Sequence, residues 1–557
     1  MPGLPRAVRR SALTFTLAAL AAWSSAQAAT CTDTVDPRSP VLSNGFGLNA
    51  ANTRNLPSQI HAGNVATLQT AHAHVADGAT DKKGTPAVTA QAIFFAEGRD
   101  LVAANRATGC VYWRYSGVSR TLLGVMPNHM RSSAIAYLPP VGEQPALVFA
   151  GDFFGNLYAV DAVSGKQLWR AFVGTDSSRH MVTGAPLVHN GTLYVPVASK
   201  EVVTAVFSVL GGCCSSHGLL QALDPYTGKV KWTYHTAQAE GSGKLPSGMS
   251  LWGAPLIDEA NQTIVFGTGQ NFAPPTSKRE DAIIALDLAT GQERWVFQST
   301  QNDAWTFSCV APRGLDGGCK FTPGGDFDFG APPMLVKLMS GEQAILAGGK
   351  NGVVYSLNPK TGAVNWQTKL GVGGALGGIH WGMAADQHRV YAAVADLTIQ
   401  KFQKLNSLNF QAMLGSNTVP SVGATPGLYA LDLLTGKLLW ERHDQHVYQG
   451  KTYDTIYSAA LTVTNDVLLA GALSGELRAL RASTGEALWT FQSAVATQDV
   501  NDGKAGHGGT IDSVGAVPVG ADLYLNSGYS SFGGPTAWHA GPGNSLFVLR
   551  LPGADAP

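Results

Sequence analysis

The sequence predicts an all-β protein, an eight-bladed β-propeller in which a tryptophan docks each blade on the next. Three observations lead to this fold class. A short phrase recurs along the chain, glycine is abundant while charge is scarce, and no long apolar stretch with a period of 3.6 residues follows the first thirty residues. We therefore expect many short strands, tight turns and few helices.

The recurring phrase is an apolar strand, a turn containing Thr-Gly or Ser-Gly, and a second strand that ends in tryptophan. Alternating apolar residues predict half-buried strands, and the glycine supplies a left-handed turn residue. Seven copies end at Trp113, Trp169, Trp232, Trp295, Trp366, Trp440 and Trp489. Their spacing of about 63 residues suits four strands, which is one propeller blade.

An eighth blade is predicted from a remnant of the phrase. LFVLRL, which begins at Leu546, keeps the first strand but has no turn and no tryptophan after it. We expect the segment around residues 41–75 to supply the missing strands and close the ring. An open β-solenoid is the alternative that the repeat leaves open.

The composition argues against a disordered protein and against a nucleic-acid-binding protein. Glycine is 65 of 557 residues and only 14% of residues are charged, with 38 basic and 38 acidic side chains. A hydrophobic share of 45% is enough for a large core and argues against disorder. The balanced charge gives no excess to neutralise phosphates, so we expect no nucleic-acid partner.

The N-terminus is typical of a secretory signal peptide. Arg6, Arg9 and Arg10 precede an apolar stretch at 12–23, and Ala26-Gln27-Ala28 is a small-x-small cleavage site. The apolar stretch is short for a membrane anchor, and no later stretch is long enough to span a membrane. The sequence predicts a signal peptide at residues 1–28, a single propeller domain at 29–557, and a periplasmic or secreted protein.

All six cysteines follow the cleavage site, and an even number in an exported protein suggests disulfides. Six cysteines allow fifteen connectivities. The sequence favours Cys309 with Cys319, which are close, and Cys213 with Cys214, which are adjacent, leaving Cys31 with Cys110. None of them forms a Cys-x-x-Cys-His motif, so we expect no c-type haem on this chain.

The repeat and several longer phrases together resemble a known enzyme family. The phrases are NGFGLNAANTRN (44–55), VTGAPLVHNGTLYVPVASKE (182–201), the Cys-Cys at 213–214, NDAWTFSC (302–309), GGDFDFGAPPML (324–335), GGKNGVVYSLNPKTG (348–362) and GGALGGIHWGMAAD (373–386). They are similar to the quinoprotein alcohol dehydrogenases that bind pyrroloquinoline quinone (PQQ) on the propeller axis, especially the polyvinyl-alcohol dehydrogenase branch. The tryptophan repeat alone is less specific, because non-enzymatic outer-membrane assembly propellers share it.

The resemblance implies a role for each of several residues. A disulfide between Cys213 and Cys214 would lie on one face of the quinone, and Trp252 would stack on the other face. Asp303 would be the catalytic base that removes the hydroxyl proton of an alcohol. The alternatives are two unrelated cysteines, a core tryptophan, and a turn aspartate that caps a backbone amide.

Further roles concern the metal and the charge of the cofactor. Glu201, Gln270 and Asn271 are the implied Ca²⁺ ligands, and the metal would polarise the quinone. Lys350 would contact the quinone oxygens and stabilise the reduced cofactor. Both Glu201 and Lys350 have the alternative of an ordinary solvated surface residue.

Two lesser candidates complete the implied site. Thr183 would hydrogen-bond a PQQ carboxylate, and Trp381 would line the substrate entrance.

The chain departs from the family at two positions. His217 stands where the family generally has an arginine that holds a cofactor carboxylate, and Gln270 stands where it usually has Asn or Asp. A neutral histidine is a poorer carboxylate clamp than arginine. The other histidines, including His72 and His74, are interpreted as surface or loop residues, and residues 397–426 as an inserted loop on one rim.

The sequence leads to three hypotheses for the function. The leading hypothesis is an exported PQQ- and Ca²⁺-dependent dehydrogenase that oxidises an alcohol, such as a secondary alcohol or a polyol like polyvinyl alcohol, to a carbonyl. Its electrons would pass to a separate acceptor such as a soluble cytochrome c. The second is a non-catalytic propeller that binds or scaffolds a partner, and the third is a quinoprotein acting on another substrate, such as a sugar.

Overall fold

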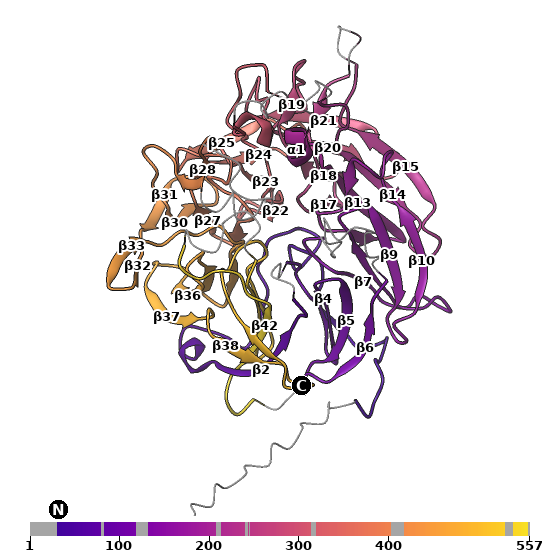
Figure 1. Cartoon of the computed structure of the whole chain (residues 1–557), viewed down its shortest axis with the longest axis vertical. Coiled ribbons are helices and arrows are strands. Elements are labelled where there is room, and N and C mark those ends of the chain that lie inside the picture. Colours follow the sequence, from indigo (N-terminus) through magenta and orange to yellow (C-terminus); the bar gives the residue numbers. More distant parts are fainter. Residues whose placement is uncertain are drawn as a thin grey trace, which may run out of the picture.

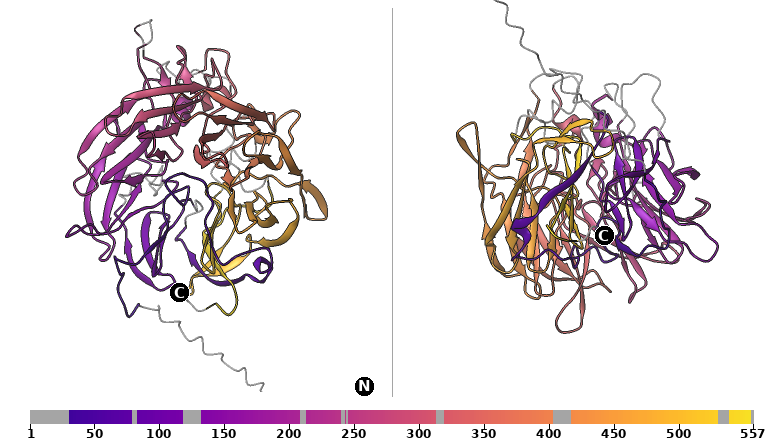
Figure 2. Two further views of the ribbon diagram at one scale, coloured as in Figure 1. Left: turned by 180° about the vertical axis from the view of Figure 1, so that it is seen from behind. Right: turned by 90° about the horizontal axis from the view of Figure 1, so that it is seen from below.

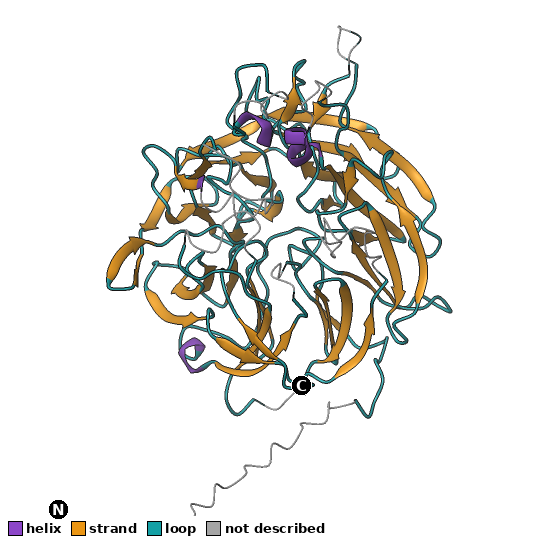
Figure 3. Cartoon of the chain, in the orientation of Figure 1, coloured by secondary structure: helices purple, strands orange, loops and turns teal. Residues whose placement is uncertain are grey.

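The computed structural model describes residues 31–78, 83–117, 132–207, 213–239, 243, 245–312, 319–402, 417–529 and 538–554. The expected signal peptide lies outside these ranges. Strands dominate the described chain and the few helical turns are short (Figure 3). The sheets follow one another around a ring (Figure 1), which the right-hand view of Figure 2 shows from its side. The prediction of an eight-bladed β-propeller is confirmed.

The blades are antiparallel sheets, each with four strands from the axis to the rim. The first four blades contain β3 (Ala87–Thr89), β4 (Ala92–Glu97), β5 (Asp100–Asn105) and β6 (Val111–Tyr115); β7 (Ala136–Leu138), β8 (Leu147–Gly151), β9 (Asn156–Asp161) and β10 (Gln167–Phe172); β12 (Leu187–His189), β13 (Thr192–Ser199), β14 (Leu219–Leu223) and β15 (Val230–His235); and β17 (Leu256–Asp258), β18 (Thr263–Gly267), β20 (Ala282–Asp287) and β21 (Glu293–Gln298).

The other four blades continue the same order, except that the last takes its outer strand from the N-terminal part of the chain. They contain β22 (Met334–Lys337), β23 (Gln343–Gly348), β24 (Val353–Leu357) and β25 (Val364–Lys369); β26 (Ala384–Ala385), β27 (Arg389–Val394), β30 (Gly427–Asp432) and β31 (Leu438–Arg442); β34 (Thr462–Thr464), β35 (Val467–Gly471), β36 (Glu476–Arg481) and β37 (Ala487–Gln492); and β40 (Ala516–Val519), β41 (Asp522–Ser527), β42 (Ser545–Arg550) and β2 (Gln69–Val75).

The connections between these strands contain further short strands and helical turns. The strands are β1 (Val41–Ser43), β11 (His180–Met181), β16 (Ser247–Gly248), β19 (Asn271–Ala273), β28 (Leu397–Ile399), β29 (Thr418–Pro420), β32 (Gln445–Tyr448), β33 (Lys451–Asp454), β38 (Ala496–Gln498) and β39 (Ala505–His507). The helical turns are α1 (Glu201–Thr204), η1 (Val65–Thr67), η2 (Ala205–Phe207) and η3 (Phe307–Cys309). No helix in the described ranges is long and apolar enough to cross a membrane.

The N-terminal segment closes the ring as expected. β2 pairs with β42 along its whole length, from Gln69 opposite Arg550 to Val75 opposite Ser545, and completes the eighth blade. β1 adds a fifth strand to the first blade by pairing with β3. Figure 1 shows the indigo β2 beside the yellow β42, so the first and last parts of the chain share one sheet.

Residues 44–60 make contacts with blades all around the ring, which the sequence did not predict. The Asn52 side chain donates to the carbonyls of Pro255 and Pro333, which precede the fourth and fifth blades. The buried Arg54 guanidinium donates to the carbonyls of Leu461, 2.6 Å away, and Val514, 2.6 Å away. This central segment therefore joins inner strands that are hundreds of residues apart in sequence.

Six of the seven repeat tryptophans contact a glycine in the turn of the next blade, and Trp489 is the exception. The indole Nε1 of Trp295 donates to the carbonyl of Pro359 at 3.0 Å. Gly362 lies in the next turn with φ +71°, and a Cβ added there would be 2.6 Å from the indole. The same contact occurs for Trp113 with Gly165, Trp169 with Gly228, Trp232 with Gly291, Trp366 with Gly436 and Trp440 with Gly485.

At the closing junction, a histidine takes the place of the tryptophan. His72 lies opposite Val548 in the sheet and against Gly109, where a Cβ would be 2.7 Å from its ring. His74, on the same strand, is 1% exposed. The interpretation of these two histidines as surface residues is therefore wrong. Burial lowers the pKa of His72 to about 4, so its ring is neutral at pH 7.

We expect Gly362→Ala to lower the free energy of unfolding by about 2 kcal/mol more than Gly450→Ala does. Both glycines have positive φ, +71° and +75°, but a Cβ at Gly450 meets nothing within 4 Å. The backbone strain of alanine is therefore shared, and only the overlap with Trp295 differs. Urea denaturation of the two variants measures this difference, and equal losses would show that close approach to the indole is not what requires glycine.

Candidate active site

The candidate residues all lie in connections at one face of the ring. In a four-stranded antiparallel blade, the connection from the second to the third strand and the connection to the next blade leave from the same face. The first kind carries Glu201, Cys213, Cys214, Gln270, Asn271 and Lys350, and the second kind carries Thr183, Trp252, Asp303 and Trp381. The Thr-Gly turns of the repeat leave from the opposite face.

Asp303 is a buried carboxylate held by backbone amides. Its side chain is 1% exposed. One oxygen accepts from the amide of Asp326 at 3.1 Å and the other from the amide of Phe327 at 2.7 Å. Burial raises the pKa of Asp303 above its ordinary value, and the hydrogen bonds from these two backbone amides offset part of that rise. A carboxylate in this setting is a stronger base than one in water.

Acidic and amide groups surround Asp303 on the side of blade four. Asn271 donates its backbone amide to the carbonyl of Asp303 at 3.0 Å and its side-chain amide to Glu280. Among the described residues, no donor reaches its buried Oδ1 or either oxygen of Asp281. Burial raises the pKa of Glu280 to about 8 and that of Asp281 well above its ordinary value.

Asp328 connects three of the candidate residues. Its carboxylate accepts from the indole Nε1 of Trp252 at 2.8 Å and from the backbone amide of Gln270 at 3.3 Å. Lys350 Nζ lies 3.3 Å from Asp328 and 3.3 Å from Asp326. Burial lowers the pKa of Lys350, but these two carboxylates raise it more, so the lysine stays protonated. The interpretation of Lys350 as a solvated surface residue is wrong, since it is 5% exposed.

Two tryptophans lie edge to face at the axis. The rings of Trp252 and Trp381 are 5.3 Å apart with an interplanar angle of 83°. The Lys350 ammonium lies over Trp252, 5.2 Å from the ring centroid. Trp252 is half-buried and Trp381 is 3% exposed. Gly330 covers part of Trp252, since a Cβ there would be 1.7 Å from the ring.

Glu201 holds the loop that carries the adjacent cysteines. One carboxylate oxygen accepts from the backbone amides of Ser215, at 2.9 Å, and Ser216, at 2.6 Å. Cys213 and Cys214 form a disulfide directly before these serines. The pairs Cys31–Cys110 and Cys309–Cys319 are also disulfides, so the expected pairing of all six cysteines is confirmed. Glu201 is 8% exposed, not a solvated surface residue.

Three residues remain to be placed: the candidate Thr183 and the two departures from the family, His217 and Gln270. Thr183 Oγ1 accepts from the ammonium of Lys83 at 2.5 Å. His217 Nε2 lies 2.9 Å from Nδ1 of His235, and burial lowers the pKa of His217 to about 4. The side-chain amide of Gln270 donates to the carbonyl of Trp305 at 3.1 Å. His217 is therefore uncharged at pH 7 and supplies no cation.

The insert at 397–426 begins with apolar residues that pack beside the Asp303 loop. Leu397, Ile399 and Phe402 belong to one buried cluster with Trp305 and Phe307. β28 and β29 pair at the base of the insert, and residues 403–416 lie outside the described ranges.

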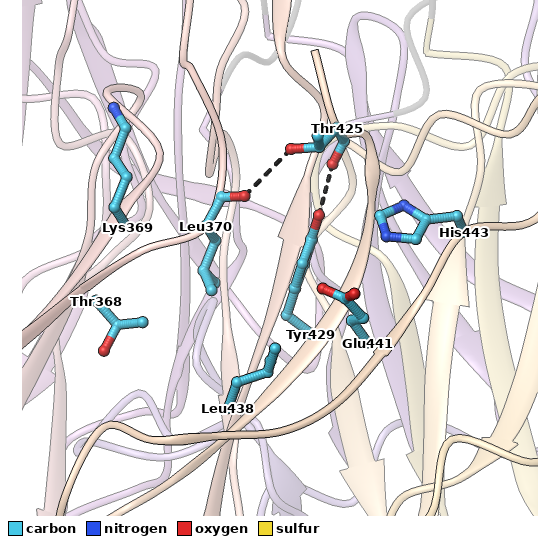
Figure 4. A pocket seen from close by; sticks show the side chains of 8 residues that line it. All are labelled: Thr368, Lys369, Leu370, Thr425, Tyr429, Leu438, Glu441 and His443. Atoms are coloured by element: carbon cyan, nitrogen blue, oxygen red, sulfur yellow. Dashed lines mark hydrogen bonds between the residues drawn. The ribbon is translucent and has the colours of Figure 1, made fainter. Parts of the chain in front are cut away.

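A separate crevice of about 250 Å³ lies between blades five and six (Figure 4). Tyr429 donates to the carbonyl of Thr425 at 2.7 Å across its wall. None of the candidate residues lines this crevice, so it is not the candidate active site.

Comparisons with known proteins identify the family. Residues 45–314 match the family described as glucose/ethanol/alcohol dehydrogenase, beta-propeller domain, and residues 279–507 match the outer membrane protein assembly factor BamB. A polyvinylalcohol dehydrogenase from Pseudomonas sp. is 31% identical over 541 residues, which cover 93% of this chain and 78% of the relative. The chain belongs to the PQQ-dependent quinoprotein alcohol dehydrogenase family.

Two further comparisons agree with this assignment. A polyvinylalcohol dehydrogenase from Sphingopyxis sp. is 31% identical to this quinoprotein, over 81% of the chain and 68% of the relative. The quinohemoprotein alcohol dehydrogenase structure from Comamonas testosteroni has a TM-score of 0.65 and 19% identity, covering 92% of this chain and 80% of that one, and shows the same fold. The quinoprotein is a PQQ-dependent alcohol dehydrogenase.

The residues at the axis fit a flat, anionic cofactor and a hard cation. Trp252 offers a half-buried aromatic face beside a protonated lysine, which suits a planar quinone that becomes anionic on reduction. Asn271 Oδ1 and the Asp281 carboxylate are buried oxygens with no donor, and Ca²⁺ takes such oxygens as ligands. Among the described residues, three clustered ligand-type side chains occur only at Cys31, Asp33 and Cys110, where the cysteines form a disulfide.

Sequence reasoning missed several residues of this site. Asp328 lies within GGDFDFG, so its repeated Asp-x-Asp could have been noticed. Asp281 directly precedes β20 and belongs to no motif, and Lys83 lies far from the other site residues in sequence. Their placement depends on how distant blades meet at the axis.

We expect Glu201→Ala to speed hydrogen exchange at the backbone amides of Ser215 and Ser216 by about tenfold to a hundredfold, because a hydrogen bond to a charged acceptor contributes about 1.5–3 kcal/mol. Glu259→Ala is the control, since that side chain is 71% exposed. Exchange rates measured by mass spectrometry that match in both variants would contradict the role of Glu201 in holding this loop.

We expect the free energy of unfolding to depend on pH through Asp512, because burial raises the pKa of this side chain to about 6. Between the ordinary value of 3.8 and about 6, the folded state binds a proton that the unfolded state has lost, so stability falls as pH rises through this window. The difference corresponds to about 3 kcal/mol. The free energy of unfolding of Asp512→Asn should lack this fall, and Asp502→Asn, a change at an exposed turn, should keep it. If the free energy of unfolding changes with pH in the same way in wild type and in Asp512→Asn, the raised pKa of Asp512 is contradicted.

Proposed function

We propose that this enzyme is exported and oxidises an alcohol to a carbonyl with Asp303 as the catalytic base, using PQQ and Ca²⁺. The single observation that supports this best is the buried Asp303 carboxylate, fixed by two backbone amides beside the Trp252–Asp328–Lys350 network. A base must be positioned before it can be effective, and both oxygens of Asp303 are held.

In the proposed reaction, an alcohol hydroxyl donates its proton to an Asp303 oxygen as the carbon–hydrogen bond breaks. When bound, PQQ would supply the two-electron oxidant for this reaction. The amides of Asp326 and Phe327 favour the ionised form of Asp303, while its burial raises the pKa and strengthens it as a base. Lys350 places a positive charge over the Trp252 face, where it favours an anionic reduced cofactor.

The proposed metal ligands are Glu201, Gln270 and Asn271. Asn271 is the best supported, because its buried Oδ1 has no donor. Glu201 already accepts three hydrogen bonds at Oε2, and its Oε1 lies 3.7 Å from Arg179 Nε, so a cation bound at Oε1 would compete with this ion pair. The metal would act as a Lewis acid on the cofactor.

The proposed substrate is a secondary alcohol or a polyol, of which polyvinyl alcohol is the polymeric example. The two relatives at 31% identity are named polyvinylalcohol dehydrogenases. Electrons would leave to a separate acceptor such as a soluble cytochrome c, since the sequence has no Cys-x-x-Cys-His motif.

An exported location is supported by the N-terminal residues 1–28 and by the three disulfides, which persist in oxidising compartments. The periplasm or the extracellular medium is the proposed site of action.

We expect protein reconstituted with PQQ and Ca²⁺ to reduce an artificial dye with an alcohol, and Asp303→Asn to lower kcat by about 10²–10⁴-fold. Quinone retention, measured by absorbance, should stay within about threefold of wild type, because the asparagine keeps the shape of the side chain. Asp502→Asn serves as the matched control, since it makes the same change at an exposed turn.

The same experiment separates the enzyme from a non-catalytic propeller. The match of residues 279–507 to an outer-membrane assembly factor and the uncharged His217 favour that second function. A scaffold protein would retain no quinone and would show no difference between Asp303→Asn and wild type, which would overturn the proposed function.

A further inference from the structure

The hairpin of β32 and β33 presents aromatic side chains to solvent at the outer edge of the ring (Figure 1). It lies in the connection from β31 to β34, between the sixth and seventh blades, so it leaves from the face that carries the candidate site. Val447 is 71% exposed, and Tyr448 and Tyr453 are exposed as well. Exposed apolar side chains that gather in one place mark a candidate binding surface.

His539, from the eighth blade, completes this aromatic surface. Its ring stacks on Tyr448, with the centroids 4.2 Å apart and an interplanar angle of 13°, and its centroid lies 4.2 Å from that of Tyr453. His446 Nε2 lies 3.0 Å from His539 Nδ1, a hydrogen-bond distance that orients the ring. His539 has a φ of +75°, which is uncommon for a residue other than glycine. We call Tyr448, Tyr453 and His539 the aromatic platform.

The aromatic platform adjoins an apolar cluster that reaches the candidate site. Trp538 directly precedes His539 and packs against a buried cluster that contains Trp305. Trp305 lies two residues after Asp303. Ile456, two residues after the end of β33, belongs to the same cluster. Packed side chains therefore connect the platform with the loop that carries the proposed base.

The charge of the platform suits an uncharged partner. Burial lowers the pKa of His446 and of His539 below the ordinary value of 6.5, so both rings are neutral at pH 7. The hairpin carries one lysine, Lys451, and one aspartate, Asp454, which balance in charge. A docking site for a charged protein ordinarily shows complementary charge, and this hairpin has no net charge to offer.

The side chains also offer both kinds of contact that a polyol chain needs. The aromatic faces pack on aliphatic groups, and the tyrosine hydroxyls can exchange hydrogen bonds with hydroxyl groups. Trp538 Nε1 is buried, and within the described ranges no acceptor reaches it, so it can donate to a ligand hydroxyl. A chain in which methylene groups alternate with hydroxyl-bearing carbons has matching groups for each.

We propose that the aromatic platform is an accessory binding surface for a polyol chain, which it holds while another part of the same chain reacts at Asp303. The inference rests on the proposed function and deepens it. A small alcohol is too short to contact both places, whereas a polymer can contact both. The second contact raises the effective concentration of the chain at the active site without changing the chemistry there.

The test is binding of fluorescein-labelled polyvinyl alcohol to the full-length protein, followed by fluorescence anisotropy without turnover. Replacing both exposed rings, Tyr448→Ala with Tyr453→Ala, should raise the Kd for the polymer about tenfold. Tyr448→Phe with Tyr453→Phe keeps both aromatic faces and should stay within about threefold of wild type. Leu434→Ala is the control, because that side chain is 62% exposed in the Thr-Gly turn of the sixth blade, on the opposite face, and it should not change the Kd.

Kinetics with PQQ, Ca²⁺ and an artificial dye give the second readout. In the double alanine variant, the KM for the polymer should rise about tenfold, like the Kd, while kcat/KM for 2-pentanol stays at the wild-type value. If the double variant does not fold, as judged by thermal unfolding, the two single alanine variants replace it, each with an expected rise of about threefold.

Equal polymer affinity in wild type and in the alanine variants would overturn the role of the platform. A loss confined to electron transfer to a cytochrome c would overturn it too, since the hairpin would then dock a protein. Wild type that binds the polymer but oxidises neither the polymer nor 2-pentanol would instead overturn the proposed function.

Discussion

Closure of the ring is the constraint on which the rest of this structure depends. A propeller blade buries its faces only against its neighbours, so one open junction exposes two apolar surfaces at once. Here closure depends on two pieces of the N-terminal segment. β2 completes the last blade, and residues 44–60 join inner strands across the axis through Asn52 and Arg54. Arg54 is fully buried, and its guanidinium donates to the carbonyls of Phe46, Leu461 and Val514, which come from three separate parts of the chain.

The candidate active site is formed where loops from different blades meet near the propeller axis, and most of its side chains are buried there. The Asp328 carboxylate ties Trp252, Gln270 and Lys350 into one network. Burial of charge is costly unless it is paired, and the network pairs Lys350 with two acids. Among the described residues, no hydrogen-bond donor reaches the two oxygens of Asp281, so they can serve as ligands for a cation.

Much of the fold could be predicted from the sequence, because a blade is a local pattern. Strand, Thr-Gly turn and tryptophan lie within thirteen residues of one another, and the structure reproduces this in seven blades. The disulfide pairs and the closing role of residues 41–75 were also predictable. His72 was not, because only its register opposite Val548 shows that it replaces a tryptophan. Lys83 and Arg54 depend on contacts between opposite ends of the chain, and no sequence spacing encodes those. The family resemblance placed Asp303 and Trp252, whereas Asp328 became evident only from its hydrogen bonds.

The pairing of β2 with β42 also sets the order in which the molecule can form. A strand near residue 70 pairs with one near residue 548, so the eighth blade needs a loop closure that spans most of the chain. Blades one to seven can assemble as neighbours while the chain is still being delivered, but the hub and the eighth blade cannot. Such high contact order makes folding slow, and the same interlock slows opening once the ring has shut. Resistance to proteases outside the cell would follow from topology rather than from any single strong contact.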